Sequence, residues 1–107
     1  MILKNITSAI ESVAPLYYQD DFDNSGLQVG CSPKEIHSVL VCLDITEDVV
    51  DEAIECGADM IVSHHPLIFK ALRQVADSTY QQRCVVKAIT HDIAVYSAHT
   101  SLDNAPG

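Results

Sequence analysis

A run of apolar residues in the middle of the chain places the strongest limit on its fold. Residues 37–43 read HSVLVCL, a nearly continuous apolar stretch that contains β-branched residues. A strand with apolar side chains on both faces is typical of a parallel sheet that is covered by helices. Two similar runs, MIV at 60–62 and IAVY at 93–96, predict two further buried strands.

Helical patterns separate these three strands. Thr46 is placed to cap a helix that ends near Gly57, with acidic residues in its first turn. Ser78 and Gln81 form the capping-box pattern S-x-x-Q, and a second helix is predicted from there to about His91. The order strand–helix–strand–helix–strand predicts the α/β class, with a mostly parallel sheet flanked by helices and right-handed crossovers.

The remaining segments are less regular. Residues 2–14 repeat apolar side chains at helical spacing and predict an amphipathic helix that is closed by Pro15. Residues 27–29 are expected to form a short strand that ends at Gly30, and residues 66–77 are expected to form a loop or an irregular short helix.

Composition narrows the class of protein. The 107 residues suffice for one domain, and 6 basic against 15 acidic residues give a net charge of −9. This acidity argues against general binding to nucleic acid or to anionic membranes, and it suits a protein that binds cations. The sequence has no apolar run near the roughly 18 residues of a membrane span. We see no secretory signal and expect a cytoplasmic protein whose four cysteines are reduced, mostly buried thiols.

Polar side chains follow all three predicted strands. Asp44 follows the first strand, His64 and His65 follow the second, and His99 and Asp103 follow the third. Parallel strands present their carboxyl ends at one edge of the sheet, where ligands bind in open α/β sheets. Imidazole and carboxylate together are ligands for divalent zinc, iron, nickel or manganese. We therefore expect a metal site formed by His64, His65 and Asp103, the alternative for the His doublet being a polar loop.

Several of these residues allow a second interpretation. Asp103 is either a metal ligand or the cap of a helix beginning at Asn104. His99 is better placed as an outer hydrogen-bond donor or a proton shuttle than as a ligand. For Asp44 we favour the N-cap of the following helix over a role near the metal. Residues 23–30 are interpreted mainly as a turn leading into a strand, which could also form one wall of the site.

Three segments together resemble the NIF-three-like family, also called GTP cyclohydrolase type-two homologs. They are DNSGLQVG at 23–30, ADMIVSHHPLIF at 58–69 and YSAHTSLDNAPG at 96–107, and LDITEDVVDEAIECGAD at 43–59 fits as well. The resemblance extends over essentially the whole chain. One departure is Phe22, where members of the family usually have tryptophan.

The resemblance implies a cytosolic α/β protein with a dinuclear divalent metal site, usually assembled as a toroidal hexamer. It assigns His64, His65 and Asp103 as ligands, and the family completes its site with a His-x-x-x-Glu pair much farther along the chain. Residues 1–107 accordingly correspond to a single α/β domain, the first half of a two-lobed protein. We expect this half alone to bind metal weakly and to have little catalytic activity.

Two functions remain open at this stage. The first is a metal-dependent hydrolase acting on a purine nucleotide such as GTP, which the family name suggests, through two ions that activate water. The second is a protein that delivers or buffers divalent metal without turnover. A purely structural metal is a third interpretation, but structural zinc sites are usually closed by four ligands, often with cysteine. The sequence does not distinguish among zinc, iron, manganese and nickel.

Overall fold

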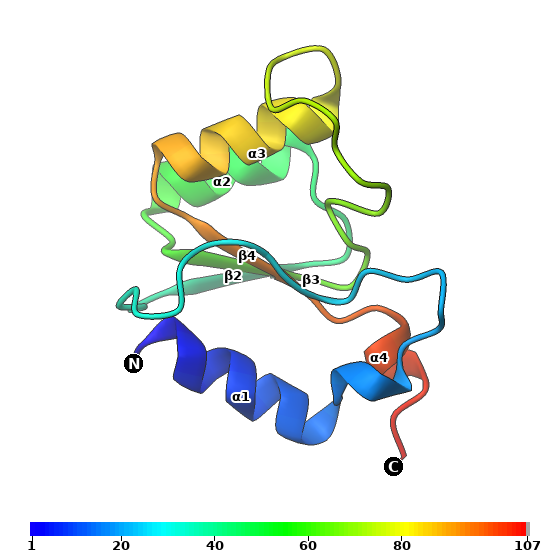
Figure 1. Ribbon diagram of the computed structural model, residues 1–107. Coiled ribbons are helices and arrows are strands. Elements are labelled where there is room, and N and C mark those ends of the chain that lie inside the picture. Colours follow the sequence, from blue (N-terminus) through cyan, green and yellow to red (C-terminus); the bar gives the residue numbers. More distant parts are fainter. Residues whose placement is uncertain (107) are drawn as a thin grey trace.

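The computed structural model describes residues 1–106 and confirms the α/β class. A four-stranded sheet lies between α1 on one face and α2 with α3 on the other (Figure 1). The elements in chain order are α1 (Leu3–Val13), the 3-10 turn η1 (Leu16–Tyr18), β1 (Gly26–Val29), β2 (Val39–Cys42), α2 (Glu47–Cys56), β3 (Met60–Ser63), α3 (Tyr80–Thr90), β4 (Ala94–Ser97) and α4 (Thr100–Asp103).

The sheet has the strand order β1-β4-β3-β2. Strands β2, β3 and β4 are parallel, as the alternation of strands and helices predicts. Strand β1 runs antiparallel to β4, with Gly26 opposite Ser97. The start of β1 therefore lies beside the end of β4, and the turn that precedes β1 is brought to the carboxyl edge of the parallel strands.

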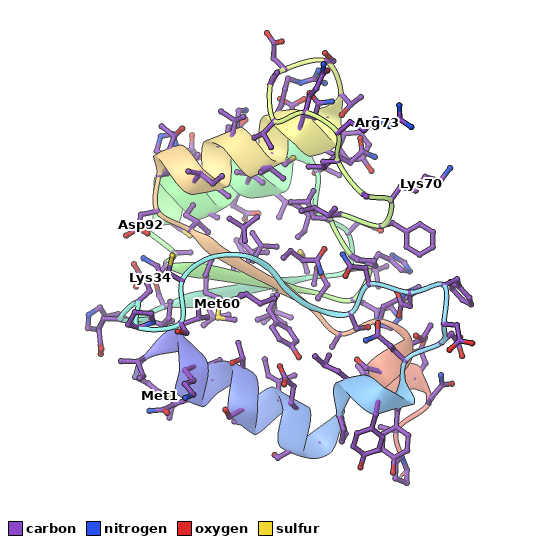
Figure 2. The ribbon with its side chains drawn as sticks, viewed as in Figure 1. Met1, Lys34, Met60, Lys70, Arg73 and Asp92 are labelled. Carbon is purple, nitrogen blue, oxygen red and sulfur yellow. The ribbon has the colours of Figure 1, made fainter. Side chains whose placement is uncertain are left out.

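Each face of the sheet has its own apolar core. On the α2 and α3 side, Ile61 and Val95 are fully buried against helix residues such as Val50. On the α1 side, Leu3 packs with Met60 and Tyr96, and Figure 2 shows Met60 between the sheet and α1. Burial on both faces explains why β3 and β4 have continuous apolar sequences. The expectation of a strand covered on both faces is wrong for β2, because β2 lies at the edge of the sheet and the side chains of Val39 and Val41 are exposed.

The two crossover helices begin with hydroxyl caps. Thr46 accepts a hydrogen bond from the amide of Val49 at 3.2 Å, and Gly57 ends α2 with a φ of 73°. Both residues act as predicted. At α3 the predicted capping box is wrong by one residue, because Thr79 rather than Ser78 adopts the extended cap conformation and accepts from the amide of Gln82 at 3.2 Å.

The loop between β3 and α3 contains no helix over residues 66–77, and Figure 2 shows Lys70 and Arg73 extending from it into solvent. All four cysteines are free, but the expectation that most are buried is wrong, because Cys31 and Cys56 are exposed at element ends. Cys84 is buried, and burial raises the pKa of its thiol to about 11. Within residues 1–106, we find no helix with the length and apolar character needed to cross a membrane.

Candidate metal centre

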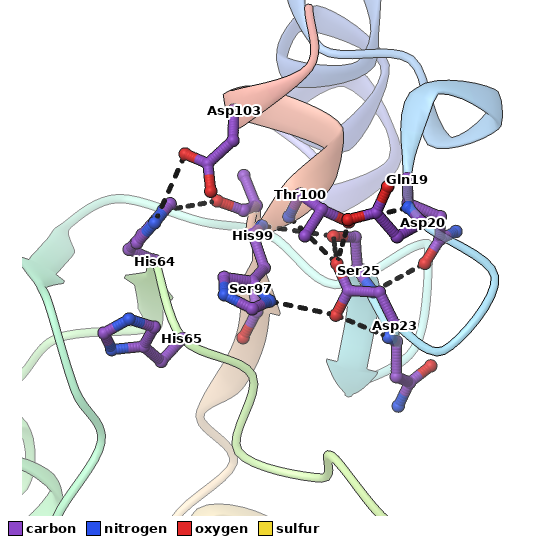
Figure 3. Close-up of polar contacts among 12 residues, drawn as sticks. Gln19, Asp20, Asp23, Ser25, His64, His65, Ser97, His99, Thr100 and Asp103 are labelled. Atoms are coloured by element: carbon purple, nitrogen blue, oxygen red, sulfur yellow. Dashed lines mark hydrogen bonds and ion pairs between the residues drawn. The ribbon is translucent and has the colours of Figure 1, made fainter.

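Three histidines meet where β3 and β4 end. Ser63 and Ser97, the last residues of these strands, are paired in register, and their hydroxyl oxygens lie 2.8 Å apart. His64 and His65 follow Ser63 directly, and His99 follows Ser97 by two residues (Figure 3). One ring nitrogen from each histidine lies within 4.8 Å of those of the other two.

The Nδ1 atom of each imidazole contacts an oxygen that can only accept a hydrogen bond. For His64 the acceptor is the carbonyl oxygen of Ala98 at 2.9 Å. For His65 it is Asp44 Oδ1 at 2.5 Å, and for His99 it is Asp23 Oδ1 at 3.1 Å. Each Nδ1 therefore carries the hydrogen, and Nε2 of the neutral ring retains the free lone pair that a metal ion requires.

Asp103 lies beside the first of these histidines. Its Oδ1 is 3.4 Å from His64 Nε2, and its side chain is half-exposed. Two ligand atoms on one tetrahedral zinc ion, each about 2.0–2.1 Å from the metal, lie roughly 3.3 Å apart. The separation thus fits two ligands of one ion. The alternative capping role is wrong, because α4 ends at Asp103 and Asn104 is its C-cap rather than the start of a helix.

Asp44 does not cap α2. The helix begins at Glu47 with Thr46 as its cap, so Asp44 lies two residues ahead of the cap. Its carboxylate is free to bond His65 instead. The interpretation of Asp44 as the N-cap of α2 was therefore wrong. Asp44 and Thr46 are both residue types that cap helices, and in the structure the hydroxyl of Thr46 is the cap.

Asp23 is the residue of this region that sequence analysis missed. Its side chain is fully buried and accepts hydrogen bonds from His99, from the hydroxyl and amide of Thr100, from Ser25 and from the amide of Asn24. Burial raises the pKa of this carboxyl, but the hydrogen bonds from Thr100, His99 and Asn24 outweigh burial and hold its pKa well below the usual range. Asp23 is therefore a buried carboxylate that remains ionised.

The only sequence signal for Asp23 was its place at the head of a polar turn, DNSG. Such residues commonly bond neighbouring backbone amides, and Asp23 does so with Asn24. Its contact with His99, 76 residues away, arises because β1 is antiparallel to β4.

The arrangement favours borderline transition metals over hard cations. Several imidazole nitrogens with one carboxylate suit zinc, iron, manganese or nickel, whereas calcium and magnesium prefer oxygen ligands. His64 and His99 are mostly covered, whereas the side chains of His65 and Asp103 are 46% and 52% exposed. A site built from these residues is open to solvent on one side.

Fold and site together define an α/β protein with an imidazole–carboxylate cluster at the carboxyl edge of its parallel strands. The chain belongs to the Duf34/NIF3 (NGG1p interacting factor 3) family, whose model matches residues 1–107. The resemblance seen in the sequence is thereby confirmed.

Relatives from two organisms match nearly the whole chain. A Clostridium perfringens protein named "GTP cyclohydrolase 1 type 2 homolog" is 42% identical over 107 residues, which is 100% of this chain and 41% of that protein. A Bacillus subtilis protein of the same name is 43% identical over 104 residues, covering 97% of this chain and 28% of its own. This chain therefore spans less than half the length of the relatives it matches.

Solved structures agree with the fold. A Bacillus cereus protein related to NIF3 matches with a TM-score of 0.90 and 42% identity, over 99% of this chain and 29% of that one. The structure of reduced HcgD from Methanocaldococcus jannaschii matches with a TM-score of 0.86 and 36% identity, over 96% of this chain and 41% of that one.

Proposed function

We propose that this chain binds divalent transition metal, with His64, His65 and Asp103 as ligands, and forms one part of a dinuclear centre. The observation that carries the proposal is the hydrogen bonding at Nδ1, which leaves the Nε2 lone pairs of the histidines free to bind metal. The separation of His64 and Asp103 supports a shared ion. In the complete protein, residues outside 1–107 would supply the further ligands of the two ions.

In the complete protein, the centre would serve a hydrolase acting on a purine nucleotide. Two bound divalent ions supply a metal-activated water and polarise the bond that it attacks. In this chain, Asp44 and the carbonyl of Ala98 orient two ligand rings, and the partly exposed edge of the cluster admits substrate. Support for the substrate class comes from the name carried by the Clostridium and Bacillus relatives.

Metal binding is tested on untagged 107-residue protein by calorimetry and elemental analysis with zinc, manganese and nickel. We expect weak binding that is lost in His65→Ala and kept in His91→Ala, because His91 lies at the end of α3. Unchanged binding in His65→Ala would contradict the proposal. Tight binding of two ions would show that no downstream ligands are needed.

Catalysis is tested separately on the full-length protein. Formate release from GTP should be lost in His65→Ala, because the substitution removes an imidazole ligand of the centre. Turnover that survives the substitution would exclude this mechanism, while the metal-binding result would stand on its own.

Metal delivery without turnover is the second candidate function. It is favoured by the exposure of the side chains of His65 and Asp103, because accessible ligands allow an ion to pass to another protein. Rapid and complete transfer of zinc to a competing fluorescent chelator, together with no nucleotide hydrolysis by the full-length protein, would support delivery. Slow transfer together with turnover would support the hydrolase.

The family resemblance also supports a proposal about the complete protein in its cell. We place it in the cytoplasm, assembled as a ring of six subunits. Light scattering of the full-length protein after size-exclusion chromatography tests the assembly, and a mass other than that of six chains would contradict it.

A further inference from the structure

We propose that two segments of this chain bind the substrate away from the metal ligands. Phe22 and Phe69 hold its planar purine ring, and Lys70 and Arg73 bind the phosphates that the ring carries. The inference rests on the function proposed above and names the residues that would recognise a purine nucleotide. None of these four side chains is among those proposed to hold metal.

The first support is a pair of exposed aromatic rings from segments far apart in the sequence. The ring centroids of Phe22 and Phe69 lie 6.2 Å apart in an edge-to-face arrangement, and the side chains are 65% and 46% exposed. Phe22 directly precedes Asp23, which bonds His99, and Phe69 follows His65 by four residues. Exposed aromatic rings so placed can stack on a planar ring of the substrate.

The second support is the way in which the loop that carries Phe69 is held. Asn24 Nδ2 donates to the carbonyl oxygen of Ile68 at 2.6 Å, and the amide of Ile68 donates to Gln28 Oε1 at 3.0 Å. Side chains from residues 23–30 thus satisfy both backbone polar groups of Ile68. This clamp holds Phe69 against Phe22 before a ligand arrives, so less conformational entropy is lost when a ring binds.

The third support is a hollow of about 480 Å³ between this loop and the start of α3. Phe69 lines it together with Lys70, Arg73 and Tyr80, and Figure 2 shows Lys70 and Arg73 extending from the same side of the loop. The volume is within the roughly 300–1,000 Å³ of small-molecule sites. Phe69 therefore belongs both to the aromatic pair and to a hollow that two cations border.

The fourth support is the distribution of positive charge. Of the six basic residues, three form ion pairs with carboxylates: Lys34, Arg83 and Lys87. Within residues 1–106, Lys70 and Arg73 form none, and Asp77 is the single acidic residue of segment 66–79. On a chain with a net charge of −9, this loop is therefore a local site of attraction for an anion. Two cations suit one phosphorylated small molecule rather than a polymer.

NMR titration of the metal-free 107-residue protein, with a chelator present, tests the proposal independently of the metal centre. GTP should shift the amide signals of residues 69–73, and its guanine H8 should show contacts to the rings of Phe22 and Phe69. Guanosine should show the same ring contacts with lower affinity. Shifts confined to the histidine cluster, or no binding at millimolar GTP, would overturn the inference. The metal-binding and formate-release tests above would be unaffected by that result.

Substitutions separate recognition of the ring from recognition of the phosphates. Phe69→Leu should weaken binding of guanosine and GTP alike by about 5-fold or more, because stacking is lost. Lys70→Gln combined with Arg73→Gln should weaken GTP binding about 5–10-fold, remove most of its salt dependence and leave guanosine binding unchanged. Lys4→Gln, which removes a positive charge from α1, is the matched control and should change neither affinity.

Two results of these substitutions would overturn the proposal. One is a GTP affinity that is unchanged in both the Phe69 variant and the double variant. The other is an equal loss of GTP and guanosine binding in the double variant, which would mean that the two cations do not contact phosphate. Neither result depends on bound metal or on turnover, so failure here is distinct from failure of the proposed hydrolase.

Discussion

Asp44 and Thr46 stand two residues apart and perform separate tasks, one for the site and one for the helix. Asp44 bonds His65 Nδ1, whereas Thr46 caps α2. We predict that Asp44→Ala weakens zinc binding about 10-fold with little change in the free energy of unfolding. Thr46→Ala should cost about 1 kcal/mol of stability and leave zinc affinity unchanged.

Calorimetry and urea unfolding on both variants check this pair of predictions. Each variant serves as the control for the other, because the substitutions lie in the same loop and each removes one polar contact. A stability loss in Asp44→Ala equal to that in Thr46→Ala would show that both residues support the helix.

At the scale of single residues, the sequence indicates the location of polar residues that come shortly after a predicted strand. His64, His65 and Asp103 were predicted to lie together because polar residues after parallel strands share one edge of the sheet, and the structure places them side by side there. Asp23 was not found as part of the site, because its approach to His99 depends on the direction of β1 and on the conformation of a polar turn. Neither of these features has a periodic signature in the sequence.

Among the secondary-structure elements, the packing of α1 on the sheet depends on one polar contact as well as on the apolar face of the helix. Tyr96 of β4 is fully buried, and its hydroxyl donates to Glu11 Oε2 of α1 at 2.9 Å. Burial and this contact raise the pKa of Tyr96, so the hydroxyl stays protonated at neutral pH. We predict that Tyr96→Phe costs about 1–2 kcal/mol of stability, because a buried hydrogen bond to a charged group is lost.

Urea unfolding checks this value, and Tyr80→Phe is the matched control. Tyr80 is exposed at the start of α3, so its substitution should change the free energy of unfolding by less than about 0.5 kcal/mol. A Tyr96→Phe variant as stable as the original protein would mean that Glu11 is equally well solvated without the hydroxyl.

The starts of β2 and β3 are joined by Asp59, whose carboxylate accepts from the amides of His37 and Ser38 at 2.8 and 3.3 Å. The hydrogen bond from His37 is the main cause that holds the pKa of Asp59 below its usual range. A carboxyl whose pKa is lower in the folded state stabilises the fold above its unfolded pKa of about 3.9. That contribution is lost as the pH falls through the folded value.

We therefore predict that Asp59→Asn lowers stability at pH 7 and flattens the decline in stability below about pH 4. Urea unfolding at a series of pH values checks this, with Asp21→Asn, an exposed turn residue, as the control. An acid decline as steep in Asp59→Asn as in the original protein would contradict the assignment.

At the scale of elements, apolar runs predicted strands and helices to within one or two residues at most ends. The errors have local causes. At α3 the chain offered Ser78 and Thr79 in succession, and only one of two adjacent hydroxyls can cap a helix. The pairing of β1 was not predictable, because four residues carry too little pattern to specify direction.

For the molecule as a whole, metal binding and folding should be linked. The candidate ligands come from the ends of β3 and β4 and from α4, so one ion would join segments up to 39 residues apart in the sequence, from His64 to Asp103. An ion that binds only the folded state at 100 times its dissociation constant adds about 2.7 kcal/mol of stability. For a domain of this size we predict a rise in Tm of roughly 10 °C or more.

Thermal unfolding of the 107-residue protein with and without zinc checks this rise, and a chelator should reverse it. Magnesium is the control, because it prefers oxygen ligands and should leave Tm unchanged. His64→Ala should abolish the response to zinc, because it removes the imidazole nearest to Asp103. An equal rise with zinc in His64→Ala would place the stabilising ion elsewhere on this acidic chain and would separate folding from the histidine cluster.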